Sequence, residues 1–344
     1  MSKITPVDPG AKSARRRARA RRWLLRTLAV TVALLAVTGT ATAIYVGSVS
    51  KSFTSHVRRE PLLPPAASGT TSTGSDNQDE PQSDGHAVNY VLMGSDSREA
   101  KDAGAGRSDT LMVLHLAADR KSAYLVSFPR DLYVPIPGYG KNKINAAFAF
   151  GGPPLTIRTL EALLGTRMDH AAIIDFEGFI GLTEQLGGVT VYNAHASSSR
   201  GYDFPKGNIT LKGDQALAFV RERYELPNGD LDRAERQRLV VQAILAKGLS
   251  ARTLADPAAF TSFVAGVGQH LTIDDGLTDS AIRKMALSLR LTADDVQLLQ
   301  APISGFGTVN GMSIDVVDQN QMSQLAEALR EDTMGDYVKN HPAK

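Results

Sequence analysis

Residues 88–134 read VNYVLMGSDSREAKDAGAGRSDTLMVLHLAADRKSAYLVSFPRDLYV, and three short apolar runs within them decide the fold class. The runs cover 88–93, 111–116 and 123–128, and polar loops with turn-forming residues separate them. Apolar runs of this length between turn signals predict β-strands. The loops at the strand ends carry paired Asp and Arg residues, so the same stretch also holds candidate site residues.

The pattern continues outward from this stretch as an alternation of strands and helices. Further strands are expected at 171–174, 189–192 and 296–300. Helical periodicity predicts six helices, at 155–164, 176–186, 213–220, 235–249, 278–291 and 322–331. This alternation predicts a layered α/β domain. From residue 250 onward the chain fits either a second lobe or an extension of the same sheet.

The N-terminal segment differs in charge from the rest of the 344-residue chain. Residues 1–26 hold nine basic residues and one acid, so the part that follows is acidic although the whole chain carries +2. Residues 28–46 contain no charged residue and are about as long as a bilayer core. The arginines before this run and Lys51 after it fit the positive-inside rule. We therefore expect a cytoplasmic N-terminus, a single transmembrane helix and an extracytoplasmic domain; a cleaved signal peptide is the alternative.

Composition sets the expected boundaries and excludes some chemistry. Residues 60–86 are rich in Pro, Ser, Gly, Thr and Asp and predict a flexible tether. The chain has no cysteine, which excludes disulfides, thiolate metal sites and cysteine nucleophiles. The expected segments are a basic tail at 1–26, a transmembrane helix at 27–47, an extracytoplasmic linker at 48–86, a main domain at 87–250 and a C-terminal extension or small second lobe at 251–344.

Two short acidic loops at strand ends provide the first candidate site. Asp96 and Arg98 follow the first expected strand, and Arg107 and Asp109 precede the second. Paired carboxylates at such a position suit a hard cation such as Mg²⁺, which binds carboxylate and phosphate oxygens. The alternative is that both aspartates are turn or capping residues with arginine partners.

A second candidate follows the strand expected at 123–128. Arg130 stands before a loop rich in Pro and Gly, and Lys141, Lys143 and Asn145 lead into the next apolar stretch. Basic groups and an amide after a strand suit an anionic ligand, whereas a solvated turn is the simpler interpretation.

The densest candidate is residues 219–245, FVRERYELPNGDLDRAERQRLVVQAIL. Arg221 and Arg223 point the same way if the segment is extended, and Arg233 and Arg236 share one face of a helix that starts near Asp230. A charged amphipathic helix with ordinary ion pairs explains part of this pattern. It explains less well why every basic position here is arginine, whose planar fork binds phosphate through two hydrogen bonds.

Together these segments resemble the LytR-CpsA-Psr family. The resemblance runs from about Tyr90 to Leu245, in the order that the family shows, and no single motif carries it alone. Its motifs are GSDSRE (94–99), GRSDT (106–110), VSFPRDLYV (126–134), KINAAF (143–148), DFEGF (175–179), LGGV (186–189) and RERY with DLDRAERQ (221–224 and 230–237).

The resemblance implies a mixed central β-sheet flanked by helices in an α-β-α arrangement, with an N-terminal transmembrane helix and a hydrophobic pocket for a polyprenyl chain. It implies a phosphotransferase of the glycopolymer–peptidoglycan ligase type, which moves a glycopolymer such as wall teichoic acid from a polyprenyl-pyrophosphate carrier to peptidoglycan. The implied Mg²⁺ (or Mn²⁺) ligands are Asp96 and Asp109. The implied pyrophosphate contacts are Arg98, Arg107, Arg130, Lys143, Arg221, Arg223, Arg233, Arg236 and Gln237, and the residues expected to be catalytic are Arg130, Arg221, Arg223 and Asp96.

Three other functions fit part of the pattern. A polyprenyl-pyrophosphate hydrolase would use the same site with water as the acceptor. A non-catalytic wall-binding receptor would keep the ligand contacts and tolerate loss of the metal ligands. A membrane-anchored transcriptional attenuator would need the basic tail to bind DNA, but the tail lies directly against the predicted span, so we expect no nucleic-acid partner. Candidates for the proton acceptor are Asp96, Asp109 and Asp230.

Overall fold

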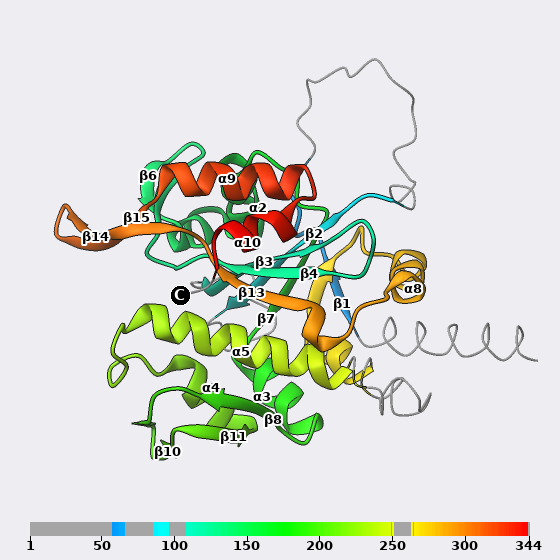
Figure 1. The fold of residues 1–344 in the computed structure, drawn as a ribbon, viewed down its shortest axis with the longest axis vertical. Helices are drawn as coiled ribbons and strands as arrows, with labels where there is room; N and C mark the ends of the chain where they lie inside the picture. The colour runs from blue at the N-terminus through cyan, green and yellow to red at the C-terminus, as the bar shows by residue number, and fades with distance from the viewer. Residues whose placement is uncertain are drawn as a thin grey trace, which may run out of the picture. The chain divides into compact units, whose positions relative to one another are not determined.

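The computed structural model describes residues 57–65, 85–95, 108–248 and 265–342, together with Ser250 and Phe263 (Figure 1). All of these residues belong to one unit, 49–344. A seven-stranded sheet crosses the middle of it. Its strands, in spatial order, are β1 (Arg58–Glu60), β12 (Thr272–Asp274), β7 (His170–Ile174), β2 (Val88–Ser95), β3 (Ser108–Leu116), β4 (Ala123–Ser127) and β13 (Val296–Gln300).

The sheet is mixed. Strands β2, β3 and β4 form an antiparallel meander, while β7 runs parallel to β2 and β13 runs parallel to β4. Strand β12 is antiparallel to β7, and β1 is parallel to β12. All five residues of β4 are buried, as expected for a central strand whose two faces are both covered. The predicted mixed sheet flanked by helices is confirmed.

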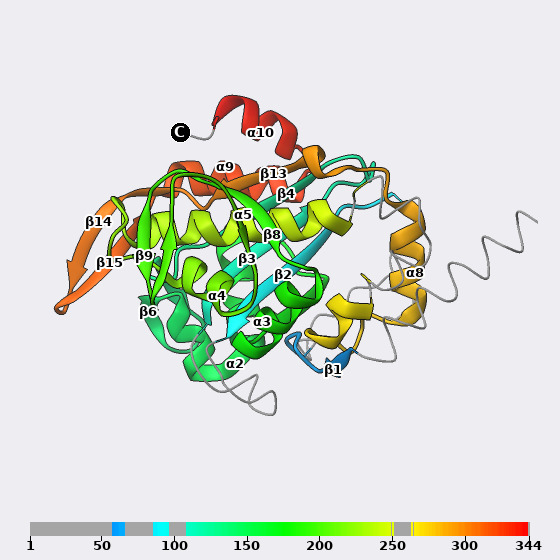
Figure 2. The same cartoon turned by 90° about the horizontal axis from the view of Figure 1, so that it is seen from below.

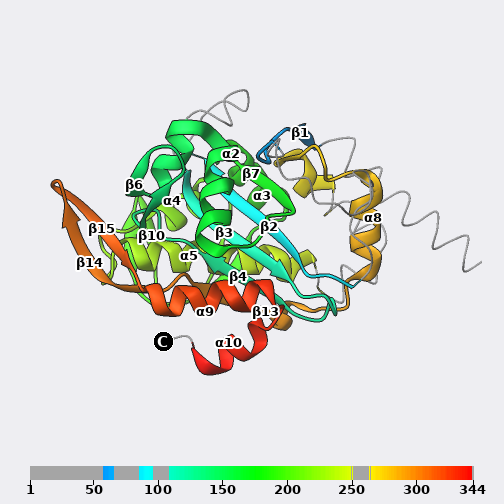
Figure 3. The ribbon, with the colours of Figure 1, turned by 90° about the horizontal axis from the view of Figure 1, so that it is seen from above.

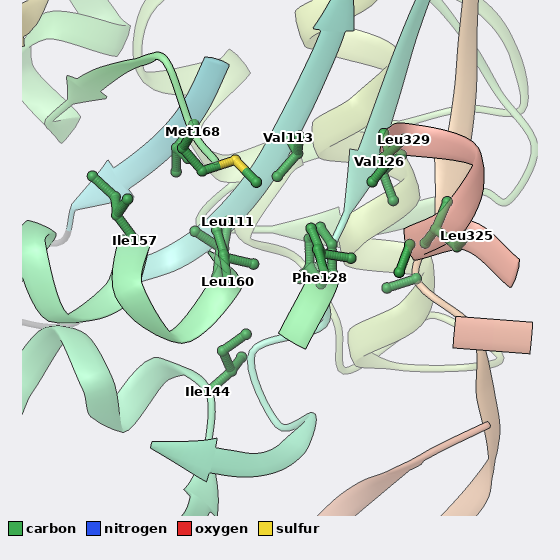
Figure 4. Close-up of a cluster of buried hydrophobic side chains, with 14 of the residues drawn as sticks. Leu111, Val113, Val126, Phe128, Ile144, Ile157, Leu160, Met168, Leu325 and Leu329 are labelled. Atoms are coloured by element: carbon green, nitrogen blue, oxygen red, sulfur yellow. The ribbon is translucent and has the colours of Figure 1, made fainter. Parts of the chain in front are cut away.

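One face of the sheet is covered by α2 (Asn145–Leu164), α9 (Gln319–Arg330) and α10 (Met334–Asn340) (Figure 1). Helix α2 is kinked at Gly151 and Gly152, where φ of Gly152 is 62°, and it continues through Pro153 and Pro154. Proline is tolerated there because the first turn after a break has no intrahelical acceptor for its N–H. The main core lies between these helices and the strands. Figure 4 shows its members Leu111, Val113, Val126, Phe128, Ile144, Ile157, Leu160, Met168, Leu325 and Leu329.

The other face carries α5 (Asp230–Gly248), and beyond it lie α3 (Phe176–Gln185), α4 (Gly213–Arg221) and the two-stranded sheet of β8 (Val189–Asn193) and β11 (Gly207–Leu211) (Figure 1); Figure 2 looks onto this side of the molecule from below. A second core of buried apolar residues joins α3, α4, α5 and β8. Asp175 caps α3 by accepting a hydrogen bond from the N–H of Gly178 at 2.7 Å. Helix α5 therefore lies between the sheet and an outer layer.

Three hairpins and two short helical segments complete the described elements. The hairpins are β5 (Tyr133–Ile136) with β6 (Gly140–Lys143), β9 (Ser197–Ser199) with β10 (Tyr202–Phe204), and β14 (Ile303–Val309) with β15 (Met312–Val317). The segments are α8 (Asp279–Ser288) and the 3₁₀ turn η2 (Ala293–Asp295). The β14–β15 ribbon extends away from the sheet (Figure 3), but its base contacts β5.

The structure differs from the expected linker at residues 58–60, selects one of the two alternatives given for 251–344, and places the strand expected at 189–192 outside the central sheet. Within the range expected to be a linker, residues 58–60 form edge strand β1, and Leu62 is buried in the main core, only 3% exposed. After residue 250 the chain contributes β12 and β13 to the central sheet and α9 to the main core, so it extends the same domain. The strand expected at 189–192 forms as β8, but it pairs with β11 outside the central sheet.

The transmembrane helix expected at 27–47 and the tail at 1–26 lie outside the described residues. Among the residues that are described, no helix combines the length and the hydropathy needed to cross a bilayer.

Candidate functional site

Three arginines from separate segments converge on Asp230, the first residue of α5. Arg233, one turn further along α5, donates from one guanidinium nitrogen to Oδ2 of Asp230 at 3.1 Å, and the same nitrogen lies 2.9 Å from Oδ1 as an ion pair. Arg130, which follows β4, places Nε 3.4 Å from Oδ1 of Asp230. Arg223, from the loop between α4 and α5, lies 3.7 Å from the same oxygen. We call these four residues the Asp230 cluster.

A second ion pair borders the Asp230 cluster. Lys143, the last residue of β6, lies with Nζ 3.0 Å from Oδ1 of Asp131. Two backbone bonds hold the hairpin in place here: the N–H of Ile144 donates to the carbonyl of Leu132 at 2.8 Å, and that of Asn145 donates to the carbonyl of Arg130 at 3.2 Å. The return of the β5–β6 hairpin therefore brings Lys143 back to the segment that carries Arg130.

The loop between α4 and α5 is held by its own acidic residues. The carboxylate of Glu222 accepts from the backbone N–H groups of Tyr224 and Glu225, at 2.6 and 2.9 Å. Burial raises the pKa of Glu222, but these hydrogen bonds favour its charged form and the net effect is a lowered pKa. Asp232 accepts from the backbone and the side chain of Asn228, at 2.8 and 3.0 Å. These two acids stabilise the loop, which weakens the interpretation of the arginines as partners of ordinary helix ion pairs.

Arg223 is the most exposed arginine of the Asp230 cluster, with 34% of its side chain accessible. It also donates to the hydroxyl of Tyr224 at 3.0 Å, and Tyr224 itself is 83% exposed. This hydrogen bond and the guanidinium charge lower the pKa of the Tyr224 hydroxyl. The side chains of Arg130, Lys143 and Arg223 are all partly open to solvent, so an anion can reach them.

Arg221 packs against an aromatic ring of helix α3. It is the last residue of α4, and its guanidinium carbon lies 4.3 Å from the ring centroid of Phe176 at the start of α3. The expectation that Arg221 and Arg223 point the same way assumed an extended segment, whereas the helix includes Arg221 and ends before Arg223. The aromatic face stabilises the Arg221 side chain in one position.

Arg236 and Gln237 were expected to contact the pyrophosphate, whereas in the structure both donate hydrogen bonds to other parts of the protein. Arg236 is 4% exposed, and one of its nitrogens donates to Asn193 Oδ1, the carbonyl of His195 and Ser197 Oγ, at 3.0, 2.9 and 3.0 Å. Its guanidinium also lies 4.2 Å from the ring centroid of Phe219. We call this the Arg236 site.

Gln237 donates from Nε2 to the carbonyl of Val220 at 3.3 Å, which connects α5 to the end of α4. The shared helix face expected for Arg233 and Arg236 is therefore divided: Arg233 bonds to Asp230, whereas Arg236 and Gln237 hold the outer layer together.

Two further charged residues near this region were not among the individual candidates from the sequence. Arg238 donates to Ser127 Oγ at 2.5 Å, and burial lowers its pKa to about 10. Asp315, on β15, is 6% exposed. Burial, followed by the charges of Asp131 and Asp230, raises the pKa of Asp315 to about 6, while Lys143 and Arg130 oppose the shift. Asp315 reaches the cluster only because β15 packs beside β5.

The expected metal ligands are only partly within the described residues. Asp96, Arg98 and Arg107 lie outside them, and Asp109 is described by its backbone alone, in β3. Strands β2 and β3 pair Gly94 with Thr110 and Ser95 with Ser108, so a β-bulge leaves Asp109 as the extra residue.

Asp96 follows Ser95 in the chain but lies outside the described residues, so the register places only the backbone of Asp109. In the described part of the chain, no three or more His, Asp or Glu side chains form a group that could hold a metal ion.

Comparisons with known proteins identify relatives of this chain. Residues 65–331 match the model of the LytR_cpsA_psr family. An Enterococcus faecalis protein named polyisoprenyl-teichoic acid–peptidoglycan teichoic acid transferase TagU is 36% identical over 241 residues, which are 70% of this chain and 78% of that protein. The crystal structure of Bacillus subtilis TagU has a TM-score of 0.54 and 30% identity, covering 72% of this chain and 97% of that one. A structure of TagT bound to LI-WTA has a TM-score of 0.57 and 27% identity, covering 72% and 91%.

The family match and these relatives define the class of protein as an enzyme of the transferase type. The family model matches well over half of the chain. The 36%-identical relative is matched over 78% of its own length. The chain belongs to the LytR_cpsA_psr family.

Proposed function

We propose that this chain is an extracytoplasmic phosphotransferase that moves a glycopolymer from a polyprenyl-pyrophosphate carrier to peptidoglycan. The observation that carries the proposal is the Asp230 cluster, in which Arg130, Arg223 and Arg233 meet from three segments with Lys143 beside them. Several partly open cations at one point suit a ligand with two phosphate groups. The transferase names of the relatives and the TagT structure with LI-WTA support this class of donor.

The reaction needs little covalent help from the protein. A hydroxyl of peptidoglycan attacks the phosphorus that carries the glycopolymer, a new P–O bond forms, and the bond to the bridging oxygen breaks so that polyprenyl monophosphate leaves. The hydroxyl proton passes to a base, for which Asp230 is a candidate in the described site. The arginines neutralise charge on the non-bridging and leaving oxygens, which is the main catalytic requirement of phosphoryl transfer.

Asp96 and Asp109 are the residues that we propose to hold Mg²⁺ or Mn²⁺, which would neutralise phosphate charge in the same reaction. We also propose that the N-terminal segment anchors the protein in the cell membrane as a single span, with the N-terminus cytoplasmic. The support for this arrangement is the uncharged run at 28–46 and the arginines that precede it.

The test uses the full-length chain in detergent with a radiolabelled polyprenyl-pyrophosphate-linked glycopolymer and peptidoglycan. We expect label to enter peptidoglycan, and we expect Arg130→Ala to reduce transfer by at least about a hundredfold, as when one charge-stabilising donor is removed from an active site. Arg158→Ala is the matched control, because Arg158 is an exposed arginine on α2. Full turnover by Arg130→Ala would contradict the proposal. Release of label into water at the same rate with and without peptidoglycan would indicate a hydrolase instead.

A further inference from the structure

Asp315 is a buried carboxyl that the proposed reaction leaves without a role. It lies on β15 at the base of the β14–β15 ribbon, where its backbone N–H donates to the carbonyl of Asp131 at 2.9 Å and forms part of a bridge to Leu132. The side chain is 6% exposed. Its Oδ2 atom is fully buried and has no hydrogen-bond partner among the described residues. A buried polar atom without a partner is rare in a native protein and calls for an explanation.

The charged groups that act on Asp315 all belong to the candidate site. Asp131 and Asp230 disfavour its ionised form, whereas Lys143 and Arg130 favour it, and burial adds to the effect of the two carboxylates. The two carboxylates come from the segment after β4 and from the start of α5, and the cations from that same segment and from β6. Asp315 is thus the third carboxyl in a site where two others already pair with the cations.

An ionised Asp315 would repel an anionic ligand, whereas a protonated Asp315 would offer it a hydrogen-bond donor. We propose that Asp315 is a further binding residue of this site, which takes up a proton together with the pyrophosphate and donates its O–H to a phosphate oxygen. This inference rests on the proposed function, because it needs a pyrophosphate ligand at the Asp230 cluster. It also accounts for the unpartnered Oδ2 atom, because a neutral carboxyl loses less than a carboxylate when a buried oxygen has no donor; the oxygen that faces the ligand is Oδ1.

The proposal makes binding depend on pH in one direction. Asp315 has a pKa of about 6 without ligand, and the negative charge of a bound pyrophosphate raises that pKa further. The ligand therefore binds the protonated form better, and the affinity falls as pH rises through 6. By linkage, the dissociation constant increases about tenfold from pH 5 to pH 7.

The experiment is calorimetric titration of the full-length chain in detergent, at fixed Mg²⁺ concentration, with a dialkyl pyrophosphate diester as the probe. The two phosphates of a diester carry fixed charges in this pH range, so a pH dependence reports the protein. We expect about a tenfold weaker affinity of the wild type at pH 7 than at pH 5. Asp315→Asn removes the titration and is expected to bind with the same affinity at both values. Asp214→Asn, on an exposed residue of α4, is the matched control and keeps the wild-type slope.

A second measurement needs no variant and covers the case in which Asp315→Asn does not fold. Titration of the wild type at pH 7 in buffers of different ionisation enthalpy is expected to show net proton uptake on binding. Absence of uptake, or an unchanged pH slope in a folded Asp315→Asn variant, would overturn the role of Asp315 and leave the proposed function intact. If the wild type binds no diester at any pH and transfers no glycopolymer, the proposed function fails and this inference fails with it.

Discussion

The Asp230 cluster and the Arg236 site place arginines from the same helix in two different environments. Arg233 and Arg236 are one turn apart on α5, and each is mostly buried. Arg233 shares Asp230 with two other arginines that are partly open to solvent. Arg236 instead donates to three neutral oxygens from β8, β9 and the segment between them.

The difference shows what makes an arginine available to a ligand. In the Asp230 cluster one carboxylate faces three guanidinium groups, so positive charge exceeds the local negative charge and an anion can be accommodated. In the Arg236 site the protein itself supplies three hydrogen-bond acceptors to one guanidinium nitrogen, together with two aromatic faces, those of Phe204 and Phe219. A buried arginine with built-in partners stabilises the fold, whereas a partly open one that shares its partner is suited to binding.

The largest expected effect is on stability at the Arg236 site. Arg236→Ala should lower the free energy of unfolding by about 4 kcal/mol, because it removes hydrogen bonds from a charged donor and leaves the buried Asn193 and Ser197 side chains without it. Chemical unfolding of the full-length chain in detergent measures this change, with Arg158→Ala as the control. At a temperature where Arg236→Ala is folded, transfer per molecule should remain above half of the wild-type value. An Arg236→Ala variant that is as stable as the wild type but inactive would instead indicate that Arg236 binds the substrate.

The next effect is on activity at the Asp230 cluster. Arg223→Ala should reduce glycopolymer transfer about a hundredfold, which corresponds to about 2.7 kcal/mol in the barrier. Its effect on the free energy of unfolding should stay below about 1 kcal/mol, since the side chain is a third exposed and its ion pair is partly solvated. The two measurements are the transfer assay and chemical unfolding. If Arg223→Ala instead lost stability and kept its turnover, the contrast between the two regions would be reversed.

The smallest expected effect concerns Arg221, the last residue of α4. Phe176→Leu keeps an apolar side chain and removes the aromatic face above which the Arg221 guanidinium lies. The loss of a cation–π contact is worth about 0.5–1 kcal/mol, so transfer should fall a few-fold, provided that Arg221 binds the ligand. Phe179→Leu, in the same helix, is the control for a general change in packing. If the two substitutions reduced transfer equally, the loss of the aromatic contact with Arg221 would be excluded as the cause.

The sequence predicted most regular elements because their patterns are local. The strands expected at 88–93, 111–116 and 123–128 correspond to β2, β3 and β4, and the helices expected at 176–186 and 213–220 correspond to α3 and α4. Helix α2 was expected only from residue 155, because the Gly and Pro residues at its kink interrupt the periodicity. Strand β1 was missed because its sequence, Arg-Arg-Glu, has no apolar run and forms only by pairing with β12.

The sequence predicted which residues belong to the candidate site, but it did not predict which of them contact one another. Arg130, Lys143, Arg223 and Arg233 were singled out as basic groups near strand and helix ends, and the structure brings them together around Asp230 and Asp131. Sequence spacing grouped Arg236 with Arg233 because residues three apart share a helix face. Sequence spacing does not determine which residues of other segments a side chain contacts, and two side chains one helical turn apart can have entirely different partners.

By itself the sequence determined the layered α/β class, because apolar periodicity directly reflects which faces are buried. It also determined the supply of arginines, whose charge does not depend on folding. Only the tertiary structure decided which arginines share Asp230 and which are enclosed by the fold, because these contacts join segments that are far apart in the chain. The same holds for Asp315: an aspartate in a short strand carries no signal of its own, and its burial beside two other carboxylates exists only after β15 packs on β5.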